Sequence, residues 1–386
     1  MNISKRQKIV KIAILHEMLI KIWGAEKVVE SISRLYPTAD VFTLLYDEKK
    51  VWTIFPKNKV HASCFSLPSQ KIYKTLKKQR LCLPFMKKSV EKLDFSAYDT
   101  VIVSSSGFAH GLITWAQTKT IIYYHAPARY MWDWCHEYRR EIWMNKGIKW
   151  FLFGKLLLWL RQWDYEAAQK NNVILANSST TQKRLSKYYR RDSQILYPPI
   201  ETRRFSQKIN TSLPTSKWKY YIILSALTEF KRIDVAIKHF PKNTGILLRI
   251  IGDGEQRNTL ESISNQNIEF LGAQYWDNLV SLVQDSLWLI FPGEEDFGMV
   301  PIEVMAAGKP VFALNTWWLT ETVIAGKTGE FFEDPEGKDF LACFQIFHQN
   351  NMQGKYTSQD CKKQAQKFDE HMFQKTLKKV VENIKN

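Results

Sequence analysis

The sequence predicts an α/β fold in which two doubly wound domains each hold a parallel sheet between helices. Two observations predict it: strand and helix patterns alternate along the chain, and the alternation pauses once near the middle. Strands that alternate with helices are typical of right-handed βαβ units in a parallel sheet. The length of 386 residues suits two domains of ordinary size.

In the first half, short apolar segments run into polar or small residues, as parallel strands do when they enter loops. Tyr98–Gly107 is a buried strand that passes into a Ser/Gly loop, and Asn177-Ser178-Ser179 caps a helix that runs to Tyr189. The other expected elements are strands at 11–16, 41–45, 119–124 and 173–176, with an amphipathic helix at 24–35.

The pattern pauses at Tyr197-Pro198-Pro199 and the polar stretch 206–217, and then restarts. Further strands are expected at 221–224, 245–251, 268–271, 287–291 and 311–314, with a last helix at 371–385. We therefore expect an N-terminal domain at 1–205, a second domain at 206–370, and a C-terminal helix at 371–386 that packs toward the first domain. Ligands should bind at the carboxyl ends of the strands, in a cleft that the two halves face.

The segment Trp288–Leu314 is the most informative part of the chain. It predicts a buried strand, a turn that holds Glu294, Glu295 and Asp296, a short helix, and a second strand. Pro301 suits the first helical turn, where no backbone donor is needed. Gly308 and Pro310 end the helix in the usual order.

The start of this short helix presents free backbone amides, which attract anions and phosphate above all. The amides belong to Phe297, Gly298, Met299 and Val300, and Glu303 lies further along the same helix. An acidic loop beside a phosphate-attracting helix end suits a ligand that carries both hydroxyls and phosphates. The segment therefore predicts a sugar-nucleotide site.

Composition narrows the class of protein. The five cysteines show no metal-binding spacing, which favours reduced thiols in the cytosol over disulfides or zinc. The apolar run Ile148–Leu160 is interrupted by lysines and is shorter than the roughly 20 residues that cross a bilayer. The net charge of +17 suits a polyanionic partner, whether nucleic acid, an anionic membrane or a phosphorylated substrate.

Two stretches alternate basic with large apolar residues at near-helical spacing, which describes either a helix that lies in a membrane interface or a solvated face over a core helix. Their basic members are Lys71, Lys74, Lys77, Lys78, Arg80, Lys87 and Lys88 in the first, and Arg139, Arg140, Lys146, Lys149, Lys155 and Arg161 in the second.

Five segments together resemble the retaining glycosyltransferase family 4, which has the GT-B fold. Glu295 and Glu303, with seven residues between them, are similar to the family's paired glutamates. The other four segments are 16–47, YYHAPARYMWD at 123–133, ILANSSTTQKRL with YPPIETRRF at 174–205, and LSALTEFKRIDVAI with IIGDGEQ at 224–256. The subset looks most like bacterial mannosyltransferases of lipopolysaccharide or exopolysaccharide synthesis.

The resemblance implies a role for each matched residue. Glu303 would hold the ribose hydroxyls and Glu295 the donor-sugar hydroxyls, while Lys231 would bind the donor diphosphate. His125 would touch the donor sugar near the reacting carbon, and Gly24 would allow close backbone approach to phosphate. The competing interpretations are a solvated helix carboxylate for Glu303 and a satisfied core histidine for His125.

The sequence departs from the family pattern at three places. Ala226 stands where an arginine is common, Ala25 where a second glycine is common, and Trp317-Trp318 where two glycines often precede the glutamate. The first two departures affect the groups expected to contact the donor phosphates, and the third affects the shape of the loop expected to contact the donor.

By resemblance, the chain would move a hexose with retention, without a cofactor or metal, from GDP-mannose to a lipid-linked bacterial glycan. It would work in the cytoplasm, peripherally on the inner face of an anionic membrane. A UDP-sugar donor is the alternative within this class. A nucleic-acid-binding protein is the alternative from another class, although no recognition motif supports it; a nicotinamide oxidoreductase is a third, but Gly252-Asp253-Gly254 lacks the full dinucleotide fingerprint.

Overall fold

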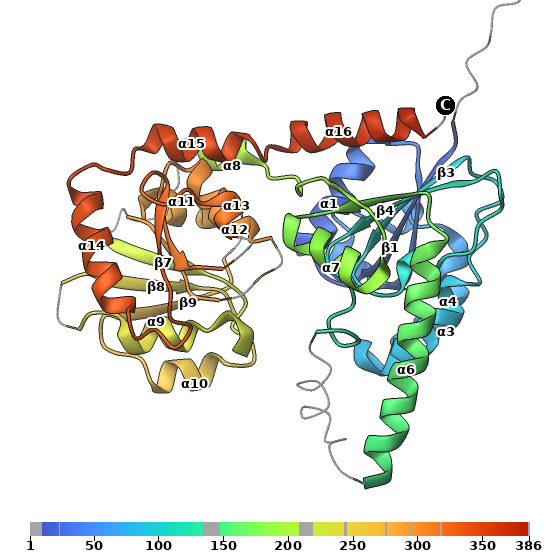
Figure 1. Cartoon of the computed structure of the whole chain (residues 1–386), viewed down its shortest axis with the longest axis horizontal. Helices are drawn as coiled ribbons and strands as arrows, with labels where there is room; N and C mark the ends of the chain where they lie inside the picture. The colour runs from blue at the N-terminus through green and yellow to red at the C-terminus, as the bar shows by residue number, and fades with distance from the viewer. Residues whose placement is uncertain are drawn as a thin grey trace, which may run out of the picture. The chain divides into compact units, whose positions relative to one another are not determined.

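The structure is a computed structural model that describes residues 10–22, 24–133, 147–207, 219–242, 245–274, 276–293, 295, 297–316 and 319–384, with only the backbone of residues 80, 147–153 and 276. The chain divides into two compact units. Unit 1 comprises Met1–Tyr197 with Gln374–Asn386, and unit 2 comprises Pro198–Phe373. Each unit is built around its own sheet (Figure 1).

In the described part of unit 1, six parallel strands follow the order β2-β1-β3-β4-β5-β6. The central strands are buried on both faces, as expected for a sheet covered by helices. The strands are β1 (Ile12–Leu19), β2 (Asp40–Tyr46), β3 (Thr100–Ser105), β4 (Lys119–Tyr124), β5 (Val173–Ala176) and β6 (Gln194–Ile195).

Helices connect these strands. In α7 (Ser179–Tyr189) the predicted cap is confirmed, because the Ser178 hydroxyl accepts a hydrogen bond from the Thr181 amide at 3.1 Å. The other α-helices of unit 1 are α1 (Gly24–Leu35), α2 (Glu48–Val51), α3 (Pro68–Leu76), α4 (Leu83–Val90) and α6 (Gly147–Gln169), and 3-10 turns include η3 (Gln79–Cys82) and η4 (Ala109–Gly111).

The described part of unit 2 repeats the design with six parallel strands in the order β12-β11-β10-β7-β8-β9. Its strands are β7 (Tyr220–Leu224), β8 (Leu247–Ile251), β9 (Ile268–Gly272), β10 (Leu289–Phe291), β11 (Val311–Leu314) and β12 (Gly329–Phe332). Its helices are α8 (Thr202–Ser206), η5 (Glu229–Lys231), α9 (Ile233–His239), α10 (Arg257–Ser262), α11 (Trp276–Asp285), α12 (Met299–Ala306), α13 (Leu319–Thr322), α14 (Phe340–Met352) and α15 (Ser358–Gln366). The predicted α/β class with two doubly wound sheets is confirmed.

Both sheets change direction beside their first strand. In unit 1 the chain leaves β1 for β2 at one edge and returns to β3 on the other side of β1. In unit 2 it leaves β7 for β8 and β9 and returns to β10 on the other side of β7. Such a switch point opens a crevice outside the carboxyl ends of the strands, where ligands of doubly wound folds bind.

An aromatic core supports the sheet of unit 2. Trp288, which directly precedes β10, is fully buried and stacks on Tyr221 of β7, with 4.0 Å between the ring centroids. Phe344 of α14 meets the same tyrosine ring edge-on at 5.3 Å. Stacked and edge-on aromatic pairs add to the stabilisation from burial, so β7 and β10 form a firm base for the loops that follow them.

The last helix, α16 (Glu370–Asn383), runs from unit 2 into unit 1. Within unit 1, the Gln374 side-chain amide donates to the carbonyl and hydroxyl oxygens of Ser31, both at 3.3 Å. Because Ser31 lies on α1, this part of α16 is fixed against α1.

Candidate functional site

The candidate site in unit 2 begins with Lys231, which ends the 3-10 turn η5 after β7. Its side chain is buried, and its Nζ donates to Oε1 of Glu295, which follows β10. A buried ammonium needs a partner that compensates for lost hydration, and the carboxylate supplies it. The structure thus brings together two residues that the sequence assigned to one ligand.

Close backbone packing holds the two loops at this pair. Gly293, two residues before Glu295, lies against the backbone of Lys231, and a Cβ on this glycine would come within 2.4 Å of the Lys231 carbonyl oxygen. A Cβ on Gly252, after β8, would come within 1.8 Å of the Ser225 carbonyl oxygen. Glycine at these positions therefore allows the loops after β7, β8 and β10 to touch.

Helix α12 begins directly after the acidic loop. Its N-cap residue, Gly298, adopts the left-handed conformation with φ of 75° and supplies no side-chain cap. The first backbone amides of the helix, those of Met299 and Val300, therefore meet no capping side chain from that residue. Both of these residues are half-buried, while the Phe297 side chain is buried and meets Phe368 edge-on at 5.8 Å.

Glu303 lies on the same helix and is only 6% exposed. A solvated carboxylate would be far more exposed, so this alternative interpretation of Glu303 is wrong. A carboxylate buried this deeply must be satisfied by hydrogen bonds or by positive charge. The helix packs against β10 and β11 of the sheet and against α8 and α15.

The candidate site in unit 1 is a chain of polar side chains that runs from the middle of β1 to the carboxyl ends of β3 and β4. Oγ of Ser104 lies 2.7 Å from Nε2 of His125 and 3.0 Å from Nδ1 of His16. On its other side, the His16 ring places Nε2 3.9 Å from Oε1 of Glu26, which is buried on α1. The register explains this meeting, because His16 pairs with Ser104 across β1 and β3.

Burial lowers the pKa of His125 to about 3. The nearby His16 lowers this pKa further by a smaller amount, and the Glu26 carboxylate raises it. The imidazole is therefore neutral at physiological pH, and each ring nitrogen is either a donor or an acceptor. A neutral imidazole suits hydrogen bonding to a sugar hydroxyl better than it suits an ion pair with phosphate.

Glu17, on β1, is a second buried carboxylate in this region of the unit 1 sheet. One oxygen, Oε1, accepts from the Ser105 hydroxyl at 3.1 Å and from the amides of Ser106, Gly107 and Ala109 at 3.1, 2.5 and 3.0 Å. The carboxylate thereby fixes the Ser/Gly loop that follows β3, close to Ser104.

Three residues of this site, Ser104, Glu26 and Glu17, were not predicted from the sequence. The Ser/Gly run at the end of the third strand indicated a polar loop. The residues that bond to it, His16 and Glu17, lie 88 residues away in sequence and reach it only through the register of the sheet. His110 is buried and near Asp164, with 3.3 Å between Nε2 and Oδ1, so it belongs to a buried network beneath the loop.

The predicted residues divide between the units. His125 and Gly24, which begins α1, belong to unit 1, while Lys231, Glu295, Phe297–Val300 and Glu303 belong to unit 2. The predictions for Glu294, Asp296 and Trp317-Trp318 lie outside the described residues, as do Arg139, Arg140 and Lys146 of the second basic stretch.

Comparison with known proteins gives one family match. Residues 205–368 match the family model of glycosyl transferases group 1. An uncharacterized glycosyltransferase of Methanocaldococcus jannaschii is 27% identical over 172 residues, which are 43% of this chain and 49% of that protein. The alpha-1,3/1,6-mannosyltransferase ALG2 of Dictyostelium discoideum is 23% identical over 256 residues, which are 55% of this chain and 61% of that protein. The chain thus matches about half the length of the first of these relatives.

The fold is shared with a solved structure. Anabaena Alr3699/HepE in complex with UDP-glucose superposes with a TM-score of 0.71 and 16% sequence identity, and the match covers 97% of this chain and 100% of that one. This likeness confirms the expected GT-B architecture of two Rossmann-like domains.

Proposed function

We propose that this chain is a retaining glycosyltransferase, because residues 205–368 match the family model of glycosyl transferases group 1. It transfers a hexose from a nucleotide sugar to a glycan hydroxyl. The observation that carries the proposal is the ion pair of Lys231 and Glu295 beside the first amides of α12, at the switch point of the unit 2 sheet.

Each group of this unit 2 site has a task in donor binding. Lys231 exchanges the Glu295 carboxylate for the donor diphosphate, and the amides of Met299 and Val300 add hydrogen bonds to the phosphates. Glu303 accepts hydrogen bonds from the ribose hydroxyls. Glu295, released from the lysine, accepts hydrogen bonds from the sugar hydroxyls.

In the transfer step, the bond between the anomeric carbon and the diphosphate oxygen breaks, and its electron pair goes to the phosphate. The acceptor hydroxyl oxygen forms the new bond on the same face, and its proton passes to a leaving phosphate oxygen. Lys231 stabilises the charge that develops on that phosphate. His125, held neutral by burial, binds a hydroxyl of the donor sugar. The sequence contains no DxD motif, which supports transfer without a metal.

For the donor we propose GDP-mannose, which the likeness to a mannosyltransferase supports. The likeness to a structure with bound UDP-glucose supports a UDP-sugar as the alternative. For the acceptor we propose a lipid-linked glycan of bacterial lipopolysaccharide or exopolysaccharide synthesis.

A transfer assay tests the proposed activity. With a lipid-linked acceptor, the wild-type chain should release nucleoside diphosphate from one sugar nucleotide, and Glu303→Ala should lower kcat/KM about 100-fold, because the ribose loses a charge-assisted acceptor. Glu261→Ala, which removes a surface carboxylate of the same unit, is the matched control and should change kcat/KM less than twofold. No release from any sugar nucleotide, or equal effects of the two substitutions, would overturn the proposal.

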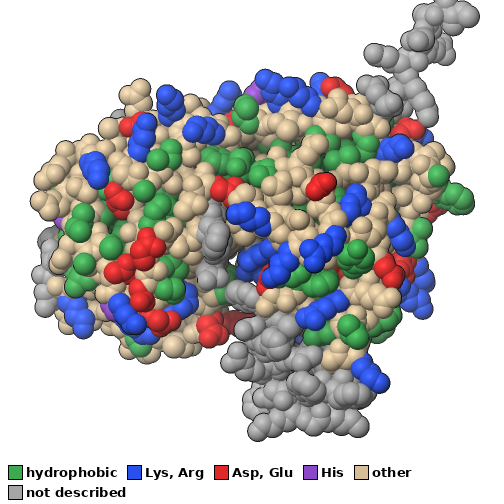
Figure 2. Space-filling view, viewed as in Figure 1, with side chains coloured by type: hydrophobic (Ala, Val, Ile, Leu, Met, Phe, Trp, Pro, Cys, Tyr) green, Lys and Arg blue, Asp and Glu red, His purple; other side chains and the backbone are tan. Residues whose placement is uncertain are grey.

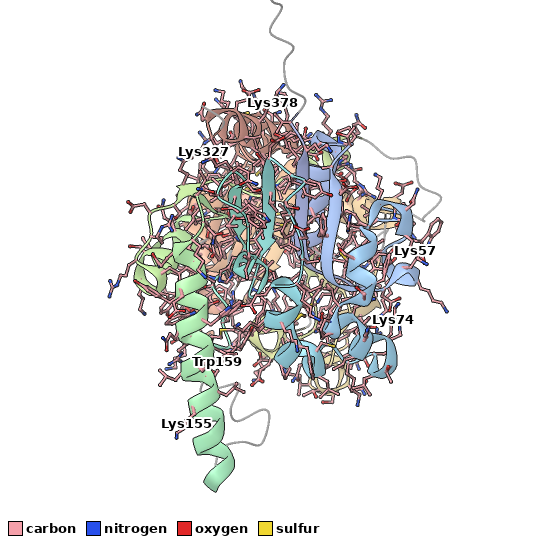
Figure 3. All side chains as sticks on the ribbon, turned by 90° about the vertical axis from the view of Figure 1, so that its right-hand side faces the viewer. Lys57, Lys74, Lys155, Trp159, Lys327 and Lys378 are labelled. Atoms are coloured by element: carbon pink, nitrogen blue, oxygen red, sulfur yellow. The ribbon has the colours of Figure 1, made fainter. Side chains whose placement is uncertain are left out.

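We further propose that the chain works in the cytoplasm, attached peripherally to the inner face of an anionic membrane. Between residues 155 and 159 of α6, only Leu157 is buried, whereas Leu158 and Trp159 are 68% and 51% exposed. Figure 3 shows Lys155 and Trp159 on the part of α6 that extends past the sheet of unit 1. Exposed Leu and Trp beside lysine are the composition of a membrane-interface helix.

Helix α4 joins α6 in this surface. The Lys87 ammonium lies 5.8 Å from the Trp159 ring centroid and 2.6 Å from a carboxylate oxygen of Glu91. Leu81 and Phe85 are exposed on η3 and α4. Lys and Arg side chains also gather over α7 in the view of Figure 2. Among the residues that the structure describes, none of the helices has the length and hydropathy of a membrane span.

Vesicle sedimentation tests this attachment. The double variant Leu158→Asp and Trp159→Asp should reduce the fraction bound to phosphatidylglycerol vesicles at least tenfold, because it removes two apolar anchors and adds charge that anionic lipid repels. Salt should weaken wild-type binding. Ile346→Asp, an equally exposed apolar position on α14, is the control and should bind as the wild type does. Failure of the wild type to sediment at low salt would contradict the proposal.

A further inference from the structure

Ser104 contacts the rings of two histidines, His125 and His16, through its hydroxyl group. Its hydroxyl lies between two imidazoles, 2.7 Å from Nε2 of His125 and 3.0 Å from Nδ1 of His16. The serine side chain is fully buried at the end of β3, and His16 is 4% exposed. With this burial the hydroxyl can serve only as a bridge, because a nucleophile needs an accessible oxygen.

A serine hydroxyl carries one proton. It can donate to only one imidazole, so at least one of the two rings must donate to it if both short contacts are hydrogen bonds. When Ser104 donates to Nε2 of His125, that ring holds its proton on Nδ1, and His16 donates from its own Nδ1. When Ser104 donates to His16, the proton of His125 lies on Nε2. Whenever Ser104 donates to one of the two rings, the tautomer of His125 is therefore coupled to the tautomer of His16.

Further contacts hold His16 and His125 on either side of Ser104. Nε2 of His16 lies 3.9 Å from a carboxylate oxygen of the buried Glu26, and Nδ1 of His16 also lies 3.3 Å from the Ser104 carbonyl oxygen. The His125 backbone is also held, because its amide donates to the Ser105 carbonyl at 2.9 Å and its carbonyl accepts from the Thr181 hydroxyl at 3.2 Å. Backbone and ring are thus fixed by separate sets of bonds.

We propose that Ser104 is a positioning residue for the transferase: together with His16 and Glu26 it holds the His125 ring in one orientation and one tautomer, and it leaves Nδ1 of His125 as the nitrogen that binds the donor sugar. This inference rests on the proposed function for its catalytic consequence. The hydrogen-bond chain that carries it lies within unit 1.

The imidazole nitrogen resonances of the full-length chain labelled with 15N-histidine test the proposal without any substrate. In the wild type, His125 should show one dominant tautomer. In Ser104→Ala the His125 resonances should move to the averaged values of two exchanging tautomers, and Ser104→Thr, which keeps the hydroxyl, should restore the single tautomer. Ser105→Ala is the matched control, because it removes the neighbouring buried hydroxyl, whose partners are Glu17 and His110.

Kinetics supply the second measurement. Ser104→Ala should lower kcat about tenfold, the effect of one lost hydrogen bond, and should change the donor KM much less. If Ser104→Ala does not fold, His16→Gln in an intact Ser104 background should release the same restraint and broaden the His125 tautomer population.

The outcomes separate this inference from the proposed function. Unchanged His125 resonances in a folded Ser104→Ala chain would overturn the positioning role, whatever the activity. A change of tautomer in a chain that transfers no sugar would support the coupling while the transferase proposal fails.

Discussion

Replacement of Lys231 by methionine should lower kcat/KM for the nucleotide-sugar donor about 100-fold and leave the fold intact. A hydrogen bond to a charged group contributes roughly 1.5–3 kcal/mol, and loss of the upper part of that range corresponds to about two orders of magnitude in affinity. Methionine keeps the buried aliphatic part of the side chain, and the Glu295 side chain is 24% exposed, so water can hydrate its carboxylate and circular dichroism and Tm should change little. Steady-state kinetics with the preferred donor measure the effect.

Two variants make this result specific. Lys238→Met removes the same charge from α9 of the same unit, where the lysine is exposed and pairs with Asp234 at 2.9 Å, and it should change kcat/KM less than twofold. Glu295→Gln frees Lys231 from its ion pair, so nucleoside diphosphate should bind more tightly while transfer falls. Equal losses in the two lysine variants would mean that Lys231 does not bind the diphosphate.

Gly293→Ala should destabilise unit 2 by about 2–3 kcal/mol, the upper range for overpacking in a close-packed region. The new methyl group would lie 2.4 Å from the Lys231 carbonyl oxygen and 2.5 Å from its Cα. Because the obstacle is backbone, a side chain cannot rotate to relieve it. The loop after β10 must move away from η5, and donor affinity should fall with stability. Urea unfolding and donor titration measure the two effects.

The control is Gly354→Ala, at a glycine with φ of 78° and open space around its absent Cβ. Its cost should be limited to left-handed backbone strain of about 1 kcal/mol, with donor affinity unchanged. A Gly293→Ala chain that matches this control in stability and affinity would show that the close packing of the two loops has no role in donor binding.

The alternation of apolar strands with helices predicted the fold class because buried parallel strands leave a strong local signal. Two features of the strands were not predicted correctly. The first strand was expected to end at His16, but β1 continues to Leu19, because the polar His16 and Glu17 are paired inside the protein. The short edge strand β12 was missed, since Gly329–Phe332 forms a strand only through its pairing with β11.

Some features of the candidate site could likewise be predicted from local sequence patterns, and others could not. Local patterns, namely a proline in the first turn of α12 and an acidic loop before it, predicted where a donor could bind. The meeting of Lys231 with Glu295 joins residues 64 positions apart and depends on the order of β7 and β10 in the sheet. Ser104 was missed because serine is common in loops, and its role appears only when β1, β3 and β4 are aligned.

Isothermal titration of the full-length chain with GDP-, UDP- and ADP-sugars tests the central claim most directly, namely that the loops of unit 2 around Lys231 and α12 bind a nucleotide sugar. We expect binding of one sugar nucleotide at one site per chain, preserved in Lys238→Met and weakened about 100-fold in Lys231→Met. Absence of binding to every sugar nucleotide in a folded wild-type chain, or binding that Lys231→Met leaves unchanged, would contradict it.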